Sequence, residues 1–349
     1  MVKLTEEAVL MSGAPIERTP TLHTHLYDNS VVVDDQPTKC YDPDGTRAWA
    51  RELERRHAKF RSINTVEDCV VDAENNVLTG PTAESSRQRL KEILNKYKSI
   101  FEGTVGNVQG DDFLVRAKID PDRSDKWPKS APMGYGKNLP ESVLKGIEDK
   151  LVDEAAEGVL TVLPRGVQPK SYLSFFGVGK KNPETAIVEL TATNVRIVGD
   201  CNRSGINDKT DHIARQTDNI HRILQIAAPY TKKGYVPQMV ISQMFHCFNL
   251  HQELWPYFCI SHPKIGFDLA FRRLPMGWIS SPSLAREMIK RIMYNHLDYC
   301  SIYMEDFVII ANSATELLDR VEKVFKALCF VLFCFIHSCI LRIKPTEYV

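Results

Sequence analysis

The sequence has no excess of charge of either sign. Its 349 residues include 44 basic and 44 acidic side chains, which gives a formal net charge of zero and a pI near 7.1. A free-standing nucleic-acid-binding domain usually has a pI above about 9. The total charge therefore does not favour that class, although it leaves room for a local basic groove.

Paired cysteines and a signal peptide are also missing. The nine cysteines form no C-x-x-C pair and no even series of spacings, which disulfide frameworks and structural zinc sites require. Residues 1–14 contain Glu6 and Glu7 and lack the basic, apolar and small-residue succession of a secretory signal. We therefore expect a reduced intracellular protein, and the sequence does not distinguish cytoplasm from nucleus.

The longest apolar run is too short for a membrane anchor. It extends from Ala327 to Leu341 and is interrupted by His337 and Ser338. A helix needs roughly 20 apolar residues to cross a bilayer. A buried helix or strand is therefore the preferred interpretation, and we predict no membrane partner.

Residues 1–84 are mostly polar and aperiodic, which predicts a poorly ordered upstream linker with one helix. Trp49, Leu53 and Phe60 fall on one face of a helix over residues 46–60. Basic side chains cover its other faces, namely Arg51, Arg55, Arg56 and Lys59. They could meet a phosphate backbone, but a solvated helix face is the preferred interpretation.

Beyond residue 84 the patterns predict a mixture of helices and short strands. Helical spacing of apolar residues predicts four helices, over residues 86–101, 141–157, 281–297 and 315–328. Residues 195–198 indicate a strand, and residues 235–248 a strand followed by a turn or helix. Residues 164–182 combine four basic residues with aromatic ones and have no acidic residue. This composition is typical of a single-strand or nucleotide groove, but also of a strand pair with a solvated edge.

An acidic pair lies between two apolar, β-prone runs. Residues 301–304 and 307–310 flank Glu305 and Asp306, which predicts a hairpin with carboxylates at its tip. Such oxygens suit Mg²⁺, which takes one or two carboxylates and keeps sites for water and phosphates. Taken alone, the pair is better interpreted as a solvated turn.

Further motifs surround this hairpin. An L-P-x-G-x-x-x-S-P string covers residues 274–282, and residues 240–246 and 256–258 lie upstream. In this order and spacing they resemble the palm of reverse transcriptases, most closely those of gypsy-type LTR retrotransposons. The same family is resembled further upstream by residues 157–160, 174–181 and 195–200. The resemblance extends from Arg87 to Pro345, about three quarters of the chain.

The resemblance implies an α+β fold, with the fingers and palm of a right-hand polymerase. Fingers would occupy residues 85–235, and a palm with an antiparallel sheet residues 236–349, with the strand at Val240 beside the hairpin. The chain stops before a thumb region, and no D-[ST]-G protease signature precedes the palm. Residues 1–84 would be a linker to other retroelement polyprotein parts.

The implied activity is RNA-directed DNA polymerisation: nucleotidyl transfer from a dNTP to a primer 3′ hydroxyl with two Mg²⁺ (or Mn²⁺) ions. The implied partners are an RNA or DNA template–primer and a dNTP. By matching position, Glu305 and Asp306 are the metal-binding and catalytic carboxylates. The implied nucleotide-binding residues are Lys180, Lys181, Arg196, Phe245, Met276, Gly277 and Tyr303. Phe245 could equally be a core aromatic.

Several positions depart from the family pattern. Val240 stands where the family has its first metal-binding aspartate, and valine offers no ligand atom. Glu305 replaces another aspartate, Asn202 an arginine and Glu347 a lysine. Residues 329–340 look like an insertion, by a retained intron or by mutational decay. We therefore predict a degenerate copy with impaired catalysis; the alternative is a non-catalytic nucleic-acid-binding remnant or pseudogene product.

Overall fold

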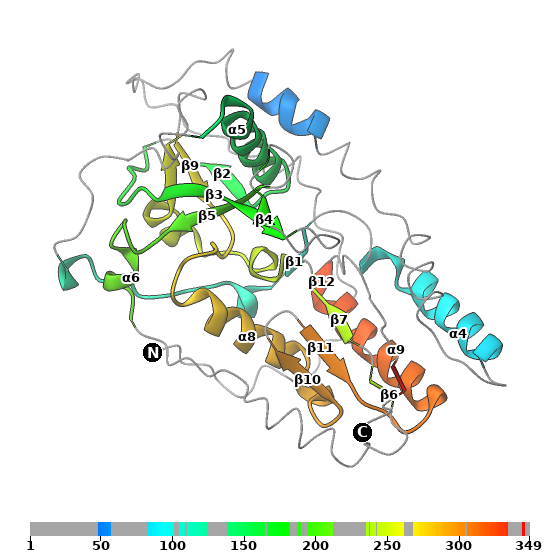
Figure 1. Ribbon diagram of the computed structural model, residues 1–349. Helices are drawn as coiled ribbons and strands as arrows, with labels where there is room; N and C mark the ends of the chain where they lie inside the picture. Colours follow the sequence, from blue (N-terminus) through cyan, green and yellow to red (C-terminus); the bar gives the residue numbers. More distant parts are fainter. Residues whose placement is uncertain are drawn as a thin grey trace.

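The computed structural model describes most of the chain after residue 82 and one short segment before it (Figure 1). The described ranges are 48–56, 83–100, 105–108, 110–124, 139–164, 166–181, 188–189, 191, 195–211, 235–236, 238–241, 243–261, 268–303, 306–333 and 344–345. Residues 48–56 form a helix. The other α-helices are α4 (Ala83–Lys96), α5 (Glu141–Ala156), α6 (Ile206–Lys209), α8 (Ser281–Ile292) and α9 (Ala314–Val331).

Short 3₁₀ helices and strands fill the space between them. The 3₁₀ helices are η2 (Lys98–Ile100), η3 (Asp111–Phe113), η4 (Pro121–Arg123), η6 (Met244–Cys247), η7 (Gln252–Tyr257) and η8 (Tyr294–His296). The strands are β1 (Asn107–Val108), β2 (Leu160–Val162), β3 (Ser174–Lys181), β4 (Val188–Glu189), β5 (Val195–Asp200), β6 (Tyr235–Val236), β7 (Gln238–Val240), β8 (Cys259–Ser261), β9 (Asp268–Phe271), β10 (Cys300–Tyr303), β11 (Asp306–Ile309), β12 (Leu332–Phe333) and β13 (Lys344–Pro345). All their pairings are antiparallel.

One sheet has the strand order β4-β3-β5, and α5 covers one of its faces. Alternate residues of a strand point to opposite faces. Phe175, Val195 and Ile197 are buried on the side of Ile147 and Leu151 from α5. The opposite face of β3 and β5 is the exposed one.

A second sheet has the order β2-β9-β8 and joins distant parts of the sequence. Leu160 pairs with Phe271, and Cys259 pairs with Ala270. This sheet therefore joins strands from both sides of residue 235.

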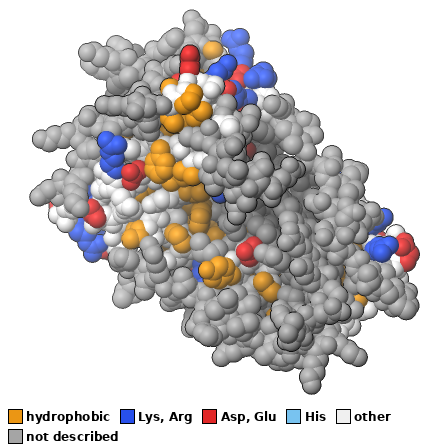
Figure 2. Space-filling view, viewed as in Figure 1, with side chains coloured by type: hydrophobic (Ala, Val, Ile, Leu, Met, Phe, Trp, Pro, Cys, Tyr) orange, Lys and Arg blue, Asp and Glu red, His pale blue; other side chains and the backbone are white. Residues whose placement is uncertain are grey.

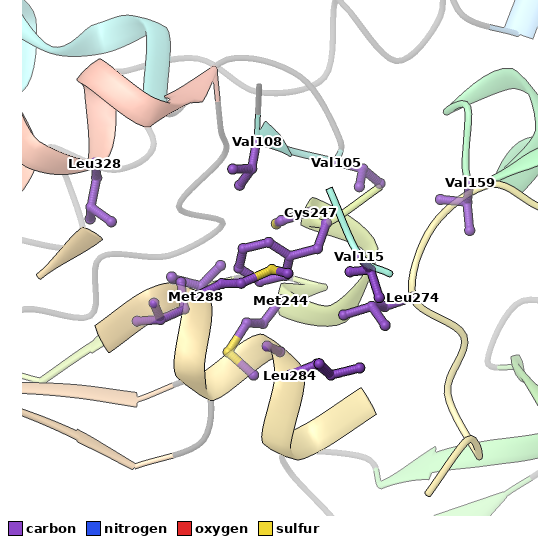
Figure 3. Close-up of a cluster of buried hydrophobic side chains, with 14 of the residues drawn as sticks. Val105, Val108, Val115, Val159, Met244, Cys247, Leu274, Leu284, Met288 and Leu328 are labelled. Atoms are coloured by element: carbon purple, nitrogen blue, oxygen red, sulfur yellow. The ribbon is translucent and has the colours of Figure 1, made fainter. Parts of the chain in front are cut away.

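The third sheet has the order β10-β11-β7. It confirms the predicted hairpin and the predicted strand beside it. Phe307 and Ile309 of β11 are buried, as are Leu317, Val321 and Phe325 of α9. The adjoining core between η6 and α8 contains Met244, Cys247, Leu284 and Met288 (Figure 3). Valines of β1 and the neighbouring segments also belong to it: Val105, Val108 and Val115.

The helix over residues 48–56 packs on α5 (Figure 1). Leu53 is buried, and the Arg56 guanidinium donates to the carboxylates of Asp149 at 3.0 Å and Asp153 at 2.7 Å. Arg56 is thus committed to an ion-pair network within the protein, and the phosphate-contact interpretation does not apply to it. The helix lies within the range predicted as a linker, 1–84, most of which is outside the described residues.

The C-terminal part of the chain returns to the body of the protein through two short strand pairs. Helix α9 continues to Val331, and Leu332 pairs with Val108 of β1. Lys344 pairs with Val236 of β6. The first residues of the predicted insertion, 329–333, therefore complete α9 and β12, while residues 334–340 lie outside the described part.

Among all the residues that the structure describes, no helix has the length and apolarity needed to cross a membrane.

Helix α5 buries an acidic side chain, Glu154, whose fractional exposure is 3%. Burial raises its pKa to about 8; Lys150 lowers the pKa, and the like charges of Glu157 and Asp153 raise it further. The folded state therefore holds a proton that the unfolded chain releases above pH 4.5. Because the folded state then binds more protons, stability falls as pH rises from about 4.5 to about 8.

Glu154→Gln is expected to remove this loss, because the amide has no ionised form. The free energy of unfolding of the variant should exceed that of the unaltered protein by on the order of 2–4 kcal/mol at pH 8. The difference should shrink towards zero near pH 4.5. Urea denaturation at several pH values measures it. Burial and the charges of Arg273 and Lys150 lower the pKa of the buried His246 to about 3. This shift changes stability equally in both proteins, so it does not affect the difference between them.

Candidate functional site

The hairpin places Asp306 directly opposite two residues of the predicted site. Asp306 pairs with Tyr303 across the hairpin and with Val240 on β7. Directly opposed residues of antiparallel strands share a face, with Cβ atoms about 4.5–5.5 Å apart. Asp306 is half-buried, and Tyr303 is 47% exposed. Glu305 lies outside the described residues.

Asp306 is the one predicted metal ligand that the structure describes. Two ions about 3.5–4 Å apart need carboxylates from more than one strand to hold them. Here the residue opposite Asp306 is Val240, whose side chain has no oxygen. Nor do the described residues contain any group of three or more His, Cys, Asp or Glu side chains able to hold a metal ion. With Glu305 outside the described residues, the binding of two Mg²⁺ ions by Glu305 and Asp306 stays a prediction.

A second group of predicted residues lies on the exposed face of β3 and β5, here called the β3–β5 face. Arg196 is exposed and pairs with Val178, and Val198 pairs with Phe176. Phe176 is 40% exposed and Val178 is 38% exposed. Figure 2 shows apolar side chains gathered on this side of the molecule, over the region of these strands. The surface combines a guanidinium with an accessible aromatic ring.

The two predicted lysines lie at the end of β3. Lys180 pairs with Glu189 and Lys181 with Val188 of β4. Their backbone positions continue the strand that carries Phe176. Their role as phosphate contacts stays a prediction.

Three other described residues of the basic and aromatic stretch, Phe175, Tyr172 and Lys170, have contacts within the protein. Phe175 is buried. The Tyr172 hydroxyl donates to Asp268 at 3.0 Å, and the Lys170 ammonium lies 4.7 Å from the centre of the Tyr257 ring. Of the three aromatic residues in that stretch, Phe176 is the one presented to solvent.

The L-P-x-G string forms a turn, residues 274–280 (the Gly277 turn), that lies against the end of β5. Gly277 is exposed and has φ +100°, a left-handed conformation that favours glycine. A Cβ added there would lie 2.0 Å from the carbonyl oxygen of Gly199 and 3.9 Å from Val198. Met276, half-buried, precedes it. The structure thus brings Gly277 close to Val198, which shares the β3–β5 face with Arg196, while the Met276 carbonyl lies 3.5 Å from a Cβ added at Gly199.

Side chains from α6 and its C-cap hold this turn. The Asn207 amide donates to the carbonyl of Gly277 at 3.2 Å, and the backbone N–H of Ile279 donates to Asn207 Oδ1 at 2.9 Å. The Trp278 indole N–H donates to Thr210 Oγ1 at 2.8 Å. Sequence reasoning missed Asn207 and Thr210, because they lie in a stretch with no apolar periodicity.

Phe245, the remaining predicted residue, lies on η6. It is half-buried and packs against the hydrophobic core. The preceding turn contains Gln243 with φ 50°. Arg273, which is buried, donates to the carbonyls of His246 at 2.8 Å and Gly158 at 3.0 Å and so fixes η6. A half-buried ring is compatible with both interpretations of Phe245.

Helix α8 connects the two groups of residues. It begins directly after the Gly277 turn and is followed by η8 and the β10–β11 hairpin (Figure 1). Met276 and Gly277 therefore precede α8, and Tyr303 and Asp306 follow it.

Comparison with solved structures shows a reverse-transcriptase-like fold of mixed helices and antiparallel sheets. A foamy viral protease-reverse transcriptase in complex with double-stranded DNA is 17% identical with a TM-score of 0.59, covering 82% of this chain and 45% of that one. The same kind of protein with an RNA/DNA hybrid is 18% identical with a TM-score of 0.60, covering 82% and 34%. The native Prototype Foamy Virus protein is 17% identical with a TM-score of 0.55, covering 87% and 35%.

The likeness concerns the fold alone. This chain spans between about a third and about half of the length of those proteins. No family model matches the sequence. No curated protein matches it either.

Proposed function

We propose that this chain is the fingers and palm part of a reverse transcriptase of retroelement origin, similar to gypsy-type elements, that binds template–primer and nucleotide with impaired nucleotidyl transfer. In this proposal the β4-β3-β5 sheet with α5 belongs to the fingers and the β10-β11-β7 sheet to the palm. Its family activity is RNA-directed DNA polymerisation. The partners are an RNA or DNA template–primer and a dNTP.

One observation supports impairment above all others: Val240 is the residue directly opposite Asp306. In the same register Met239 pairs with Phe307 and Gln238 with Val308. A hydrocarbon side chain there supplies no negative charge for cation binding, in a reaction that requires charge neutralisation.

Binding is supported by the β3–β5 face. It offers the exposed guanidinium of Arg196 and the exposed ring of Phe176. Guanidinium groups suit phosphates, and aromatic rings stack on bases without sequence preference. Two of the solved structures of similar fold contain double-stranded DNA or an RNA/DNA hybrid, which is the partner class proposed here.

Arg196→Ala is expected to weaken binding of a fluorescein-labelled template–primer by about three- to tenfold and to reduce the salt slope of log K by about 1, because one phosphate contact is lost. Fluorescence anisotropy between 50 and 200 mM NaCl measures both. Arg51→Ala is the matched control, because Arg51 is an exposed arginine on the helix that packs behind α5; it should leave the slope unchanged.

The same preparation decides between binding and catalysis. Primer extension with a dNTP mixture and Mg²⁺ or Mn²⁺ should give no product above the no-enzyme control. Product formed by the unaltered chain would overturn the impairment. Absence of template–primer binding at 50 mM NaCl would overturn the binding function.

A further inference from the structure

Asn207 connects the end of β5 with the Gly277 turn. Its Nδ2 donates to Asn202 Oδ1 at 2.7 Å and to the Gly277 carbonyl at 3.2 Å. Its Oδ1 accepts the backbone N–H of Ile279 at 2.9 Å. One side chain thus contacts the residues on both sides of Trp278.

This hydrogen-bond pattern fixes the amide in one orientation. Both hydrogens of Nδ2 have carbonyl-type acceptors, and Oδ1 has a donor. Rotating the amide by 180° would place Oδ1 against two oxygens and Nδ2 against a backbone N–H. Three bonds of good geometry to a single half-buried side chain restrain the turn more than any one of them would.

The turn held by Asn207 adjoins the β3–β5 face. A Cβ added at Gly277 would lie 3.9 Å from Val198 Cγ1. Val198 lies on the same face of β5 as Arg196, two residues earlier. Val198 is itself paired with Phe176. The exposed backbone of Gly277 therefore extends the surface that presents the guanidinium and the aromatic ring.

We propose that Asn207 is a positioning residue for ligand binding. It holds the Gly277 backbone beside the β3–β5 face, and the sugar–phosphate backbone of a template–primer contacts Gly277 there. This inference rests on the proposed function. Asn207 acts through Gly277, since its own amide is occupied by protein partners. It adds no charge, so it contributes to affinity without contributing to the salt slope.

The test compares Asn207→Ala and Asn207→Asp with the unaltered chain, using anisotropy of the same labelled template–primer. Asn207→Ala is expected to weaken binding about tenfold at pH 7.5 with an unchanged salt slope, because loss of the hydrogen bonds that orient the turn removes about 1–1.5 kcal/mol. Asn295→Ala, an exposed asparagine on η8, is the matched control and should bind as the unaltered chain does.

Asn207→Asp supplies a readout that lost stability alone would not give. The carboxylate keeps the acceptor for Ile279 but faces two oxygens, which raises its pKa; the protonated acid regains one donor. The loss of template–primer affinity in Asn207→Asp, relative to the unaltered chain, should therefore fall from about tenfold at pH 7.5 to about threefold at pH 5. Circular dichroism confirms that each variant is folded at the assay temperature.

The outcomes are distinguishable. If the unaltered chain binds and Asn207→Ala binds equally well, the positioning role is overturned while the proposed function stands. If Asn207→Asp shows the same deficit at both pH values, the positioning role is likewise overturned, since the donor to Gly277 is then irrelevant. If the unaltered chain does not bind the probe, the proposed function fails and this inference fails with it.

Discussion

Gly277→Ala is expected to destabilise the protein by on the order of 4 kcal/mol. The new Cβ would lie 2.0 Å from the Gly199 carbonyl oxygen, a backbone atom that cannot rotate away. Forcing the chain segments apart costs about 1–3 kcal/mol. The φ of +100° adds about 1–2 kcal/mol for an L-residue. Urea denaturation followed by circular dichroism measures the change in free energy of unfolding.

Gly166→Ala separates the two contributions. Gly166 also has a positive φ, +83°, but a Cβ added there meets nothing within 4 Å. Gly166→Ala should therefore lower the free energy of unfolding by about 1–2 kcal/mol, from backbone strain alone. Equal losses in the two variants would contradict the close approach of the Gly277 turn to β5.

Elements with strong local patterns could be predicted from the sequence. The apolar spacing in residues 315–328 predicted a helix, which the structure confirms as α9. Ser281 and Pro282 predicted the start of a helix over residues 281–297; α8 begins there but ends at Ile292 and is followed by η8. Two β-prone runs around an acidic pair predicted the β10–β11 hairpin. These signals are local, because each follows from the period with which one element buries its own side chains.

Pairings between distant, very short strands could not be predicted. Asn107–Val108 pairs with Leu332–Phe333, and Leu160–Val162 pairs with Asp268–Phe271. Segments of two to four residues have no readable period, and their partners are chosen by the packing of the elements around them. The position of Asn207 is similar, because its importance arises from the turn that lies against it.

Composition alone was a poor guide to the binding surface. Residues 164–182 have the composition of a nucleotide groove. Within the protein, however, Lys170 donates to the Tyr257 hydroxyl and Tyr172 donates to Asp268. A half-buried sheet satisfies its polar side chains internally wherever a neighbouring element supplies a partner. Only the strand register shows that Arg196 and Phe176 share the exposed face.

Val240→Asp is expected to create a divalent-ion site between β7 and β11. The new carboxylate would stand directly opposite Asp306. Like charges in directly opposed positions destabilise a sheet by about 0.2–1 kcal/mol. Without divalent ions the variant should therefore melt at a lower temperature than the unaltered protein. Added Mg²⁺ or Mn²⁺ should reverse the loss, because an ion bound only by the folded state stabilises it.

Primer extension then tests the catalytic consequence. Restoring one carboxylate at a site of charge neutralisation is worth on the order of a hundredfold in rate. Val240→Asp should thus give metal-dependent product where the unaltered chain gives none. Val240→Asn, of the same size but uncharged, is the matched control and should show neither the metal-dependent melting shift nor product. A melting shift without extension would place the remaining lesion elsewhere, at Asn202 or at Glu305; no shift would show that the residue opposite Asp306 is not a ligand position.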